Sequence, residues 1–218
     1  MCMRDRLLAK KILTNAIDER SVRLDEISVL SLSKDVFSGD LFITARHPDG
    51  SLNILIADFT GHGLSAAVGA LPVADTFSVM TKKGFELGFI LESINSKLHT
   101  LLPTNMFMAC SVLNVSTDLK QVKIWNGGMP DIYIRKVETG KLQHTIKSSH
   151  IPLGITEVIE NENEYDLTTV KLTPGDQLIL FTDGLTDALN ANGDMFGEQR
   201  LEDCLKINSD DESALTTL

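Results

Sequence analysis

Two helical segments lie next to each other in the middle of this 218-residue chain, and short apolar strands separated by tight turns flank them on both sides. Residues 61–80 are rich in small side chains, and residues 87–101 repeat apolar side chains at three- and four-residue steps. The strands are expected at residues 27–33, 41–46, 52–58, 107–115, 121–126, 132–137, 141–146, 165–171 and 177–181. Two short helices are expected after them, at residues 185–189 and 197–206.

Turn sequences that contain Gly, Pro or Asp connect most neighbouring strands, which predicts hairpins and hence mainly antiparallel sheets. The last two strands are expected to form one such hairpin across Thr173-Pro174-Gly175-Asp176. Strand runs around a segregated helix pair predict an α+β fold in which helices cover the faces of the sheets.

The domain organisation follows from the same pattern. No linker interrupts residues 24–207, so residues 23–218 are expected to form one domain. Residues 3–20 predict a short amphipathic helix. Within residues 1–22, this helix either packs on its own domain or forms a helical linker or dimer helix behind an upstream domain. A homodimer through this helix is therefore one open possibility.

Charge and cysteine content limit the function classes. The net charge of -10, from 30 acidic and 20 basic residues, argues against a nucleic-acid groove and against binding to anionic lipid. Cys2, Cys110 and Cys204 show no zinc-ligand spacing and indicate free thiols in a reducing compartment. No signal-peptide core and no apolar run of the ~20 residues that span a bilayer are present, so a cytoplasmic protein is expected.

Three segments place an aspartate beside glycine at the end of an apolar run. A carboxylate at the rim of a core is costly unless a cation or a strong donor meets it, and glycine lets the backbone approach a ligand closely. Carboxylates that converge from separate strands suit a hard ion such as Mg²⁺ or Mn²⁺. Taken singly, each aspartate is more typical of a turn or a helix N-cap, and Asp183 precedes a predicted helix. The segments are Ser38-Gly39-Asp40, residues 54–63 around Asp58, and residues 178–184 around Asp183.

Taken together and in this order, the segments resemble the SpoIIE-like branch of the PPM (type 2C) serine/threonine phosphatases. The similarity runs from about residue 24 to residue 207 and includes Phe196-Gly197 before the last helix. Its motifs are Ser38-Gly39-Asp40, Ala57-Asp58-Phe59-Thr60-Gly61-His62-Gly63, Asn126-Gly127-Gly128-Met129-Pro130, Pro152-Leu153-Gly154 and residues 181–188, Phe-Thr-Asp-Gly-Leu-Thr-Asp-Ala.

The resemblance implies an α/β/β/α sandwich of two mainly antiparallel sheets flanked by helices. It also implies a site for two ions, Mg²⁺ or Mn²⁺, at which Asp58 bridges both and the carbonyl of Phe59 binds one. Asp40 and Asp183 complete the catalytic set. The implied reaction is hydrolysis of phosphoserine or phosphothreonine on a signalling protein, in this branch an anti-sigma factor antagonist. His62 is either a general acid or simply part of the first turn of its helix.

The chain departs from this family's pattern after residue 207. Members usually carry a further Asp before a final strand, whereas here Asp210-Asp211 precedes what reads as another helix. The final strand and one metal ligand are therefore expected to be missing, which fits either a fragment or a degenerate site. A pseudophosphatase that binds a signalling partner without turnover is the alternative to an enzyme. A nucleotide-binding fold that uses Gly61-His62-Gly63 is a third reading, opposed by the missing GxGxxG and P-loop motifs. A response-regulator context follows from the resemblance alone.

Overall fold

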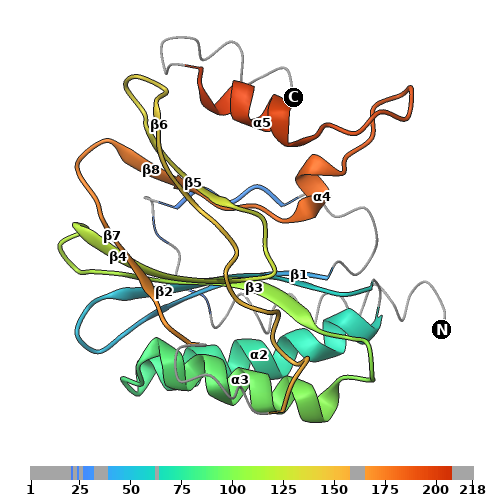
Figure 1. The fold of residues 1–218 in the computed structure, drawn as a ribbon. Helices are drawn as coiled ribbons and strands as arrows, with labels where there is room; N and C mark the ends of the chain where they lie inside the picture. The colour runs from blue at the N-terminus through green and yellow to red at the C-terminus, as the bar shows by residue number, and fades with distance from the viewer. Residues whose placement is uncertain are drawn as a thin grey trace.

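Four layers make up the molecule, which we describe from a computed structural model (Figure 1). The structure describes residues 21, 24, 27–31, 39–61, 64–157 and 165–207. Two helices lie against one sheet, a second sheet lies on the other face of the first, and a short helix covers the far face of the second sheet. This is the α/β/β/α sandwich expected from the sequence.

The first sheet is antiparallel and has the strand order β1-β2-β3-β4-β7. Tight turns join β1 to β2 and β3 to β4, so these pairs are the predicted hairpins. The strands are β1 (Asp40–Arg46), β2 (Leu52–Phe59), β3 (Met108–Val115), β4 (Gln121–Gly127) and β7 (Thr168–Lys171).

The second sheet has the order β6-β5-β8 and is also antiparallel. It packs on the first sheet through apolar side chains from both, with Ile124, Leu113 and Ile132 fully buried between them. Its strands are β5 (Ile132–Lys136), β6 (Leu142–Ile146) and β8 (Asp176–Ile179).

The helices cover the outer faces. α2 (Leu64–Lys82) and α3 (Leu87–Leu101) pack on the first sheet, and Phe77 and Leu91 are among the side chains fully buried there. α5 (Glu198–Leu205) packs on the second sheet through Leu201. The one-turn helix α4 (Asp183–Thr186) lies at the edge of the sandwich, between β8 and α5 in the chain.

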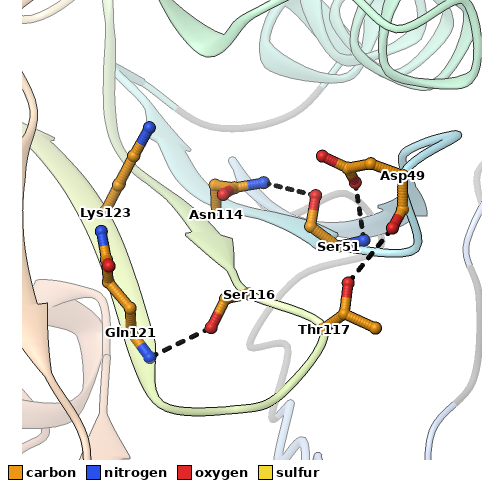
Figure 2. Close-up of a pocket in the computed structure, with 7 residues that line it drawn as sticks. All are labelled: Asp49, Ser51, Asn114, Ser116, Thr117, Gln121 and Lys123. Carbon is orange, nitrogen blue, oxygen red and sulfur yellow. Dashed lines mark hydrogen bonds between the residues drawn. The ribbon is translucent and has the colours of Figure 1, made fainter.

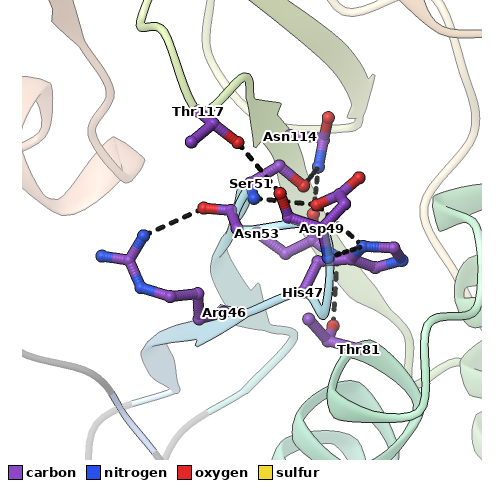
Figure 3. A network of polar contacts seen from close by, with 9 residues as sticks. Arg46, His47, Asp49, Ser51, Asn53, Thr81, Asn114 and Thr117 are labelled. Atoms are coloured by element: carbon purple, nitrogen blue, oxygen red, sulfur yellow. Dashed lines mark hydrogen bonds and ion pairs between the residues drawn. The ribbon is translucent and has the colours of Figure 1, made fainter.

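A buried polar network fixes the ends of the β1–β2 and β3–β4 hairpins (Figure 3). Asn114 Nδ2 donates hydrogen bonds to Asn53 Oδ1 (2.7 Å) and Ser51 Oγ (3.0 Å), and Asn53 Nδ2 donates to Thr81 Oγ1 in α2 (3.1 Å). In the turn itself, the N–H of Ser51 donates to Asp49 Oδ1 (2.8 Å). Buried polar groups are stable only when they are paired, so the network sets how α2 sits on the sheet.

Two strand predictions were wrong. The segments around β7 and β8 do not form a hairpin, because β7 pairs with β4 in the first sheet and β8 pairs with β5 in the second. The turn between them crosses from one sheet to the other, and Lys136 of β5 holds it through Asp176 (2.8 Å) and the carbonyl of Pro174 (2.6 Å). Residues 27–31 form no strand either. Leu30 is 84% exposed there, and among the described residues no strand pairs with this segment. β propensity alone was therefore not enough to form a strand.

Several predictions concern residues outside the described ranges, namely the helix at residues 3–20, the role of His62 and the reading of Asp210-Asp211. None of the described helices has the length and apolar character needed to cross a membrane.

Candidate active site

Asp40 and Asp58 face each other across the β1–β2 hairpin. They are register partners at the open end of the hairpin. The turn lies at the other end of the two strands, next to the pair Arg46 and Leu52. Side chains alternate along a strand, and directly opposed residues of an antiparallel pair share a face. On β2, Ala57 and Phe59 are buried against the helices. Asp58 and its partner Asp40 therefore point to the other face, toward the second sheet.

Gly39 brings backbone and side-chain oxygens together beside this pair. The carbonyl of Gly39 accepts a hydrogen bond from the N–H of Phe59 (3.1 Å). A Cβ built on Gly39 would lie 2.7 Å from Asp58 Oδ1, 2.7 Å from the carbonyl oxygen of Phe59 and 3.3 Å from that of Gly61. Three oxygens thus surround a small space that any side chain at position 39 would fill, which explains the glycine before Asp40.

Asp183 reaches the same region from the second sheet. The chain leaves β8, buries Phe181 against Tyr133 in a parallel ring stack with centroids 6.1 Å apart, and then starts α4. Asp183 is the first residue of α4, and the N-cap is Thr182, which makes no side-chain capping bond. The helix-cap reading of Asp183 is therefore wrong, and its exposed carboxylate faces the cavity described next.

A cavity of about 220 Å³ separates Asp58 from Asp183. Ala109, the neighbour of Asp58 on β3, forms part of its wall, and the loop Gly128-Met129-Pro130 after β4 forms the rest. None of these wall residues carries a charge, so the carboxylates are the only ionisable groups among the cavity's lining residues.

Asn126 holds the wall of this cavity in place. Its side chain is 2% exposed, accepts a hydrogen bond from Ser111 Oγ (3.2 Å) and donates one to the carbonyl of Pro130 (3.0 Å). Its backbone carbonyl accepts hydrogen bonds from the N–H groups of Ser149 and His150 (both 3.2 Å). The side chain therefore fixes the Gly128-Met129-Pro130 loop against β3.

Gly127 at the end of β4 and Gly128 at the start of the loop are required by close packing. A Cβ on Gly127 would overlap the ring of Trp125, and one on Gly128 would lie 2.5 Å from Pro152. Gly128 also has a φ of 77°, which favours glycine. The contact of Gly128 with Pro152 shows that the segments Asn126-Gly127-Gly128 and Pro152-Leu153-Gly154 pack against each other.

The charges of Asp40 and Asp183 both act on the carboxylate of Asp58. Burial, together with the negative charges of Asp40 and Asp183, raises the pKa of Asp58 to about 6. Asp58 is therefore the common neighbour of the other two. Within the described ranges, no three His, Cys, Asp or Glu side chains are grouped closely enough to enclose a single ion.

The donor set fits hard divalent cations. Mg²⁺, Mn²⁺ and Ca²⁺ prefer carboxylate and carbonyl oxygens, which are what Asp40, Asp58, Asp183 and the carbonyl of Phe59 offer. The space beside Gly39 brings a carboxylate oxygen and two carbonyl oxygens near one point. A nearby cation would also relieve the repulsion that raises the pKa of Asp58.

A second hollow, of about 270 Å³, lies at the opposite end of β2 and β3 (Figure 2). Its polar side chains bond largely to one another or to nearby backbone, as in the bond from Thr117 Oγ1 to the carbonyl of Asp49 (3.2 Å). It contains one carboxylate, Asp49, whose pKa is lowered to about 2 chiefly by hydrogen bonds from Ser51. This hollow therefore lacks the unsatisfied carboxylates that distinguish the Asp58 cavity.

Comparison with known proteins agrees with this geometry. The family model described as stage II sporulation protein E (SpoIIE) matches residues 48–217, more than half of the chain. The chain belongs to the SpoIIE family. Two relatives of this SpoIIE-family chain come from Bacillus subtilis and are 24% identical to it. Phosphoserine phosphatase RsbP aligns over 83% of this chain and 44% of its own length, and phosphoserine phosphatase RsbU over 77% and 48%.

Solved structures show that this SpoIIE-family chain has the PP2C fold. The PP2C domain of SiaA from Pseudomonas aeruginosa superposes with a TM-score of 0.76 at 22% identity, over 93% of this chain and 80% of that one. The PP2C phosphatase domain of SpoIIE from Bacillus subtilis gives a TM-score of 0.58 at 18% identity, over 79% and 48%. The chain spans less than half the length of the curated relatives RsbP and RsbU.

The residues predicted from the sequence of this SpoIIE-family chain come together in space. Asp40, Asp58, the carbonyl of Phe59 and Asp183 all lie at one end of the sandwich, and their role as ligands stays a prediction. Sequence reasoning did not name Ala109, Met129, Pro130 or the side chain of Asn126 as part of the site. The motif Asn126 to Pro130 contained the signal, but neutral side chains and glycines point to no chemistry until their contacts are known.

Proposed function

We propose that this chain is a metal-dependent protein phosphatase that hydrolyses phosphoserine or phosphothreonine on a signalling protein. The observation that carries the proposal is the convergence of Asp40 and Asp183 on the carboxylate of Asp58, at a cavity with an otherwise uncharged wall. Membership of the SpoIIE family and the names of RsbP and RsbU, both phosphoserine phosphatases, support the same activity.

Asp40, Asp58 and Asp183 would hold two divalent cations, Mg²⁺ or Mn²⁺, with the carbonyl of Phe59 as a further ligand. By analogy with the family, Asp58 would be a ligand of both ions, and its position between Asp40 and Asp183 supports that role. When bound, such ions bind the phosphoryl oxygens and lower the pKa of a water that attacks phosphorus.

The residues of the chain prepare the site for this chemistry. Asp58, with a pKa of about 6, is ionised at neutral pH and is then available as a ligand. Gly39 leaves free the space between the oxygens of Asp58 and Phe59, and Asn126 fixes the wall opposite them. A covalent thiol mechanism is not supported by Cys110, because burial raises the pKa of its thiol and keeps it protonated.

The proposed substrate is a phosphorylated anti-sigma factor antagonist, the partner implied by the resemblance to the SpoIIE-like branch. Removal of the phosphate would free the antagonist to bind its anti-sigma factor. Because such partners control transcription, the same proposal places the protein in the cytoplasm. A response-regulator context and a homodimer through residues 1–22 stay predictions.

The test is phosphate release from a phosphoserine-bearing antagonist protein, with Mn²⁺ and with excess EDTA. We expect release that depends on Mn²⁺ and is lost in Asp58→Asn. The matched control Asp166→Asn, at an exposed aspartate that does not line the cavity, should keep full activity. Equal release in EDTA would contradict the proposal. If calorimetry detects neither Mn²⁺ binding nor turnover, the chain is instead a pseudophosphatase that binds its partner.

A further inference from the structure

Exposed apolar side chains lie on the loop between α4 and α5. Leu189 and Met195 are 63% and 60% exposed, and Leu185 of α4 is 41% exposed. Leu189 and Met195 are partners in an isolated antiparallel bridge, so their side chains lie on the same side of the loop. We call Leu185, Leu189 and Met195 the α4–α5 patch.

The loop that carries the patch is held in a fixed shape. Asn190 Oδ1 accepts hydrogen bonds from the N–H groups of Asn192 (2.9 Å) and Asp194 (3.0 Å), and its Nδ2 donates to Asp194 Oδ2 (3.1 Å). The N–H of Phe196 donates to the carbonyl of Ala188 (2.8 Å), which closes the loop at its base. A surface held in this way loses little conformational entropy when a partner binds to it.

The patch is joined directly to the candidate active site. Asp183, which lines the cavity with Asp58, is the first residue of α4, and Leu185 follows in the same helical turn. In Figure 1 the loop, drawn in red, projects outward from α4 beyond the layers of the sandwich. A protein that places a phosphorylated residue in the cavity would therefore meet α4 and this loop with the surface around that residue.

The charges around the patch indicate what kind of surface it fits. Residues 184–200 contain three acidic side chains, Asp187, Asp194 and Glu198, and one basic side chain, Arg200, which donates a hydrogen bond to the carbonyl of Met195 (3.3 Å). The excess of negative charge makes the loop unsuited to bind the phosphorylated side chain itself. It attracts a partner whose apolar contact area is surrounded by basic side chains. A second copy of this chain, with a net charge of -10, would bring like charges together.

We propose that the α4–α5 patch is a docking surface for the folded phosphoprotein substrate, which contacts it through an apolar area ringed by Lys and Arg beside the phosphoserine. The inference rests on the proposed phosphatase function. Docking at the patch supplies affinity for the protein, while the carboxylate site acts on the phosphate. Small phosphoesters reach the cavity without touching the patch.

The experiment compares the variants Leu189→Gln and Met195→Gln on two substrates with Mn²⁺. One is the phosphorylated anti-sigma factor antagonist, and the other is p-nitrophenyl phosphate. Each variant should raise KM for the phosphoprotein about tenfold, because it removes an apolar side chain from the contact. Turnover of p-nitrophenyl phosphate and the melting temperature should stay unchanged. Leu119→Gln is the matched control, since Leu119 is 59% exposed in the β3–β4 turn, away from the Asp58 end of the sheet.

Each outcome decides between docking and its alternatives. Unchanged KM for the phosphoprotein in both variants would overturn the proposal, and so would an equal loss on both substrates, which would mean that the loop shapes the cavity. Turnover of p-nitrophenyl phosphate without turnover of the phosphoprotein by the wild type would also overturn it. If the wild type hydrolyses neither substrate, the proposed function is wrong. Calorimetry of phosphoprotein binding then tests the patch by itself. Weaker binding by the two variants than by the wild type supports docking at the patch, and equal binding overturns it.

Discussion

Replacement of Asp58 by asparagine should stabilise the metal-free protein, although most substitutions destabilise. The folded state raises the pKa of Asp58 from its ordinary value of 3.8 to about 6, so it binds the proton more tightly than the unfolded chain does. Stability contributed by the protonated carboxyl is therefore present below pH 3.8 and is lost as the pH rises through about 6. The asparagine side chain of the variant stays neutral at every pH and avoids this loss.

The size of the effect follows from the shift. A change of about two pKa units corresponds to at most ~3 kcal/mol at neutral pH. Because Asp58 is only half-buried, water screens part of the repulsion, and we expect about 1 kcal/mol. For a protein of this length, that difference raises the melting temperature by roughly 2–4 °C.

Thermal unfolding in EDTA at pH 7.5 measures this difference. Asp58→Asn should melt above the wild type, and its advantage should shrink as the pH is lowered toward 4. Saturating Mn²⁺ should reverse the order, since the wild type gains more binding energy than the variant. The control Asp166→Asn should melt like the wild type in both buffers. If Asp58→Asn melts below the wild type in EDTA and Mn²⁺ changes neither protein, the reasoning about converging carboxylates is refuted.

Three further predictions concern the same site. Gly39→Ala places a methyl group against oxygens of Asp58 and Phe59 and should weaken Mn²⁺ binding at least about tenfold by calorimetry. Gly88→Ala in α3, where the added methyl meets Tyr165 at an ordinary 3.8 Å, should leave it unchanged. Mn²⁺ must displace the proton of Asp58, so its affinity should be about tenfold lower at pH 5 than at pH 7.5, and a pH-independent affinity would exclude Asp58 as a ligand. Asn126→Ala removes the buried hydrogen bonds to Ser111 and Pro130; urea unfolding should show a loss of about 2 kcal/mol, and phosphate release should fall because the cavity wall is loosened.

Local sequence was enough to predict the hairpins. The β1–β2, β3–β4 and β5–β6 pairs each have a short turn whose own residues fix it, such as the bond from the N–H of Ser51 to Asp49 Oδ1. Residues 87–101 were predicted with the bounds that α3 has, because its buried stripe follows helical spacing. In these elements the deciding contacts lie within a few residues of one another.

Non-local contacts decided the elements that were predicted wrongly. The Pro174-Gly175 turn reverses the chain, but nothing in it specifies that β7 joins β4 while β8 joins β5. Lys136, a residue far earlier in the sequence, holds that turn to the second sheet. The expected strand at residues 27–33 failed for a related reason, since residues 27–31 lack a neighbouring strand among the described parts of the chain.

The candidate site was predictable in its charged residues and not in its walls. Asp40 and Asp58 meet because the β1–β2 turn sets their register, which is local information. Asp183 joins them only because the second sheet packs on the first. Its place beside Gly184 at the end of an apolar run marked it as a candidate, but the family pattern was needed to group it with Asp40 and Asp58. The loop at Gly128 depends on space beside Pro152 and on a positive φ, which no isolated segment reveals.

Anomalous diffraction from crystals of this chain grown with Mn²⁺ at neutral pH tests the central claim most directly. We predict two peaks about 4 Å apart that share Asp58, one of them beside Asp40 and the carbonyl of Phe59 and the other beside Asp183. Crystals of Asp58→Asn should lose at least one of the peaks. A Mn²⁺-soaked crystal with no peak at Asp58, or with Mn²⁺ bound elsewhere, would contradict the account.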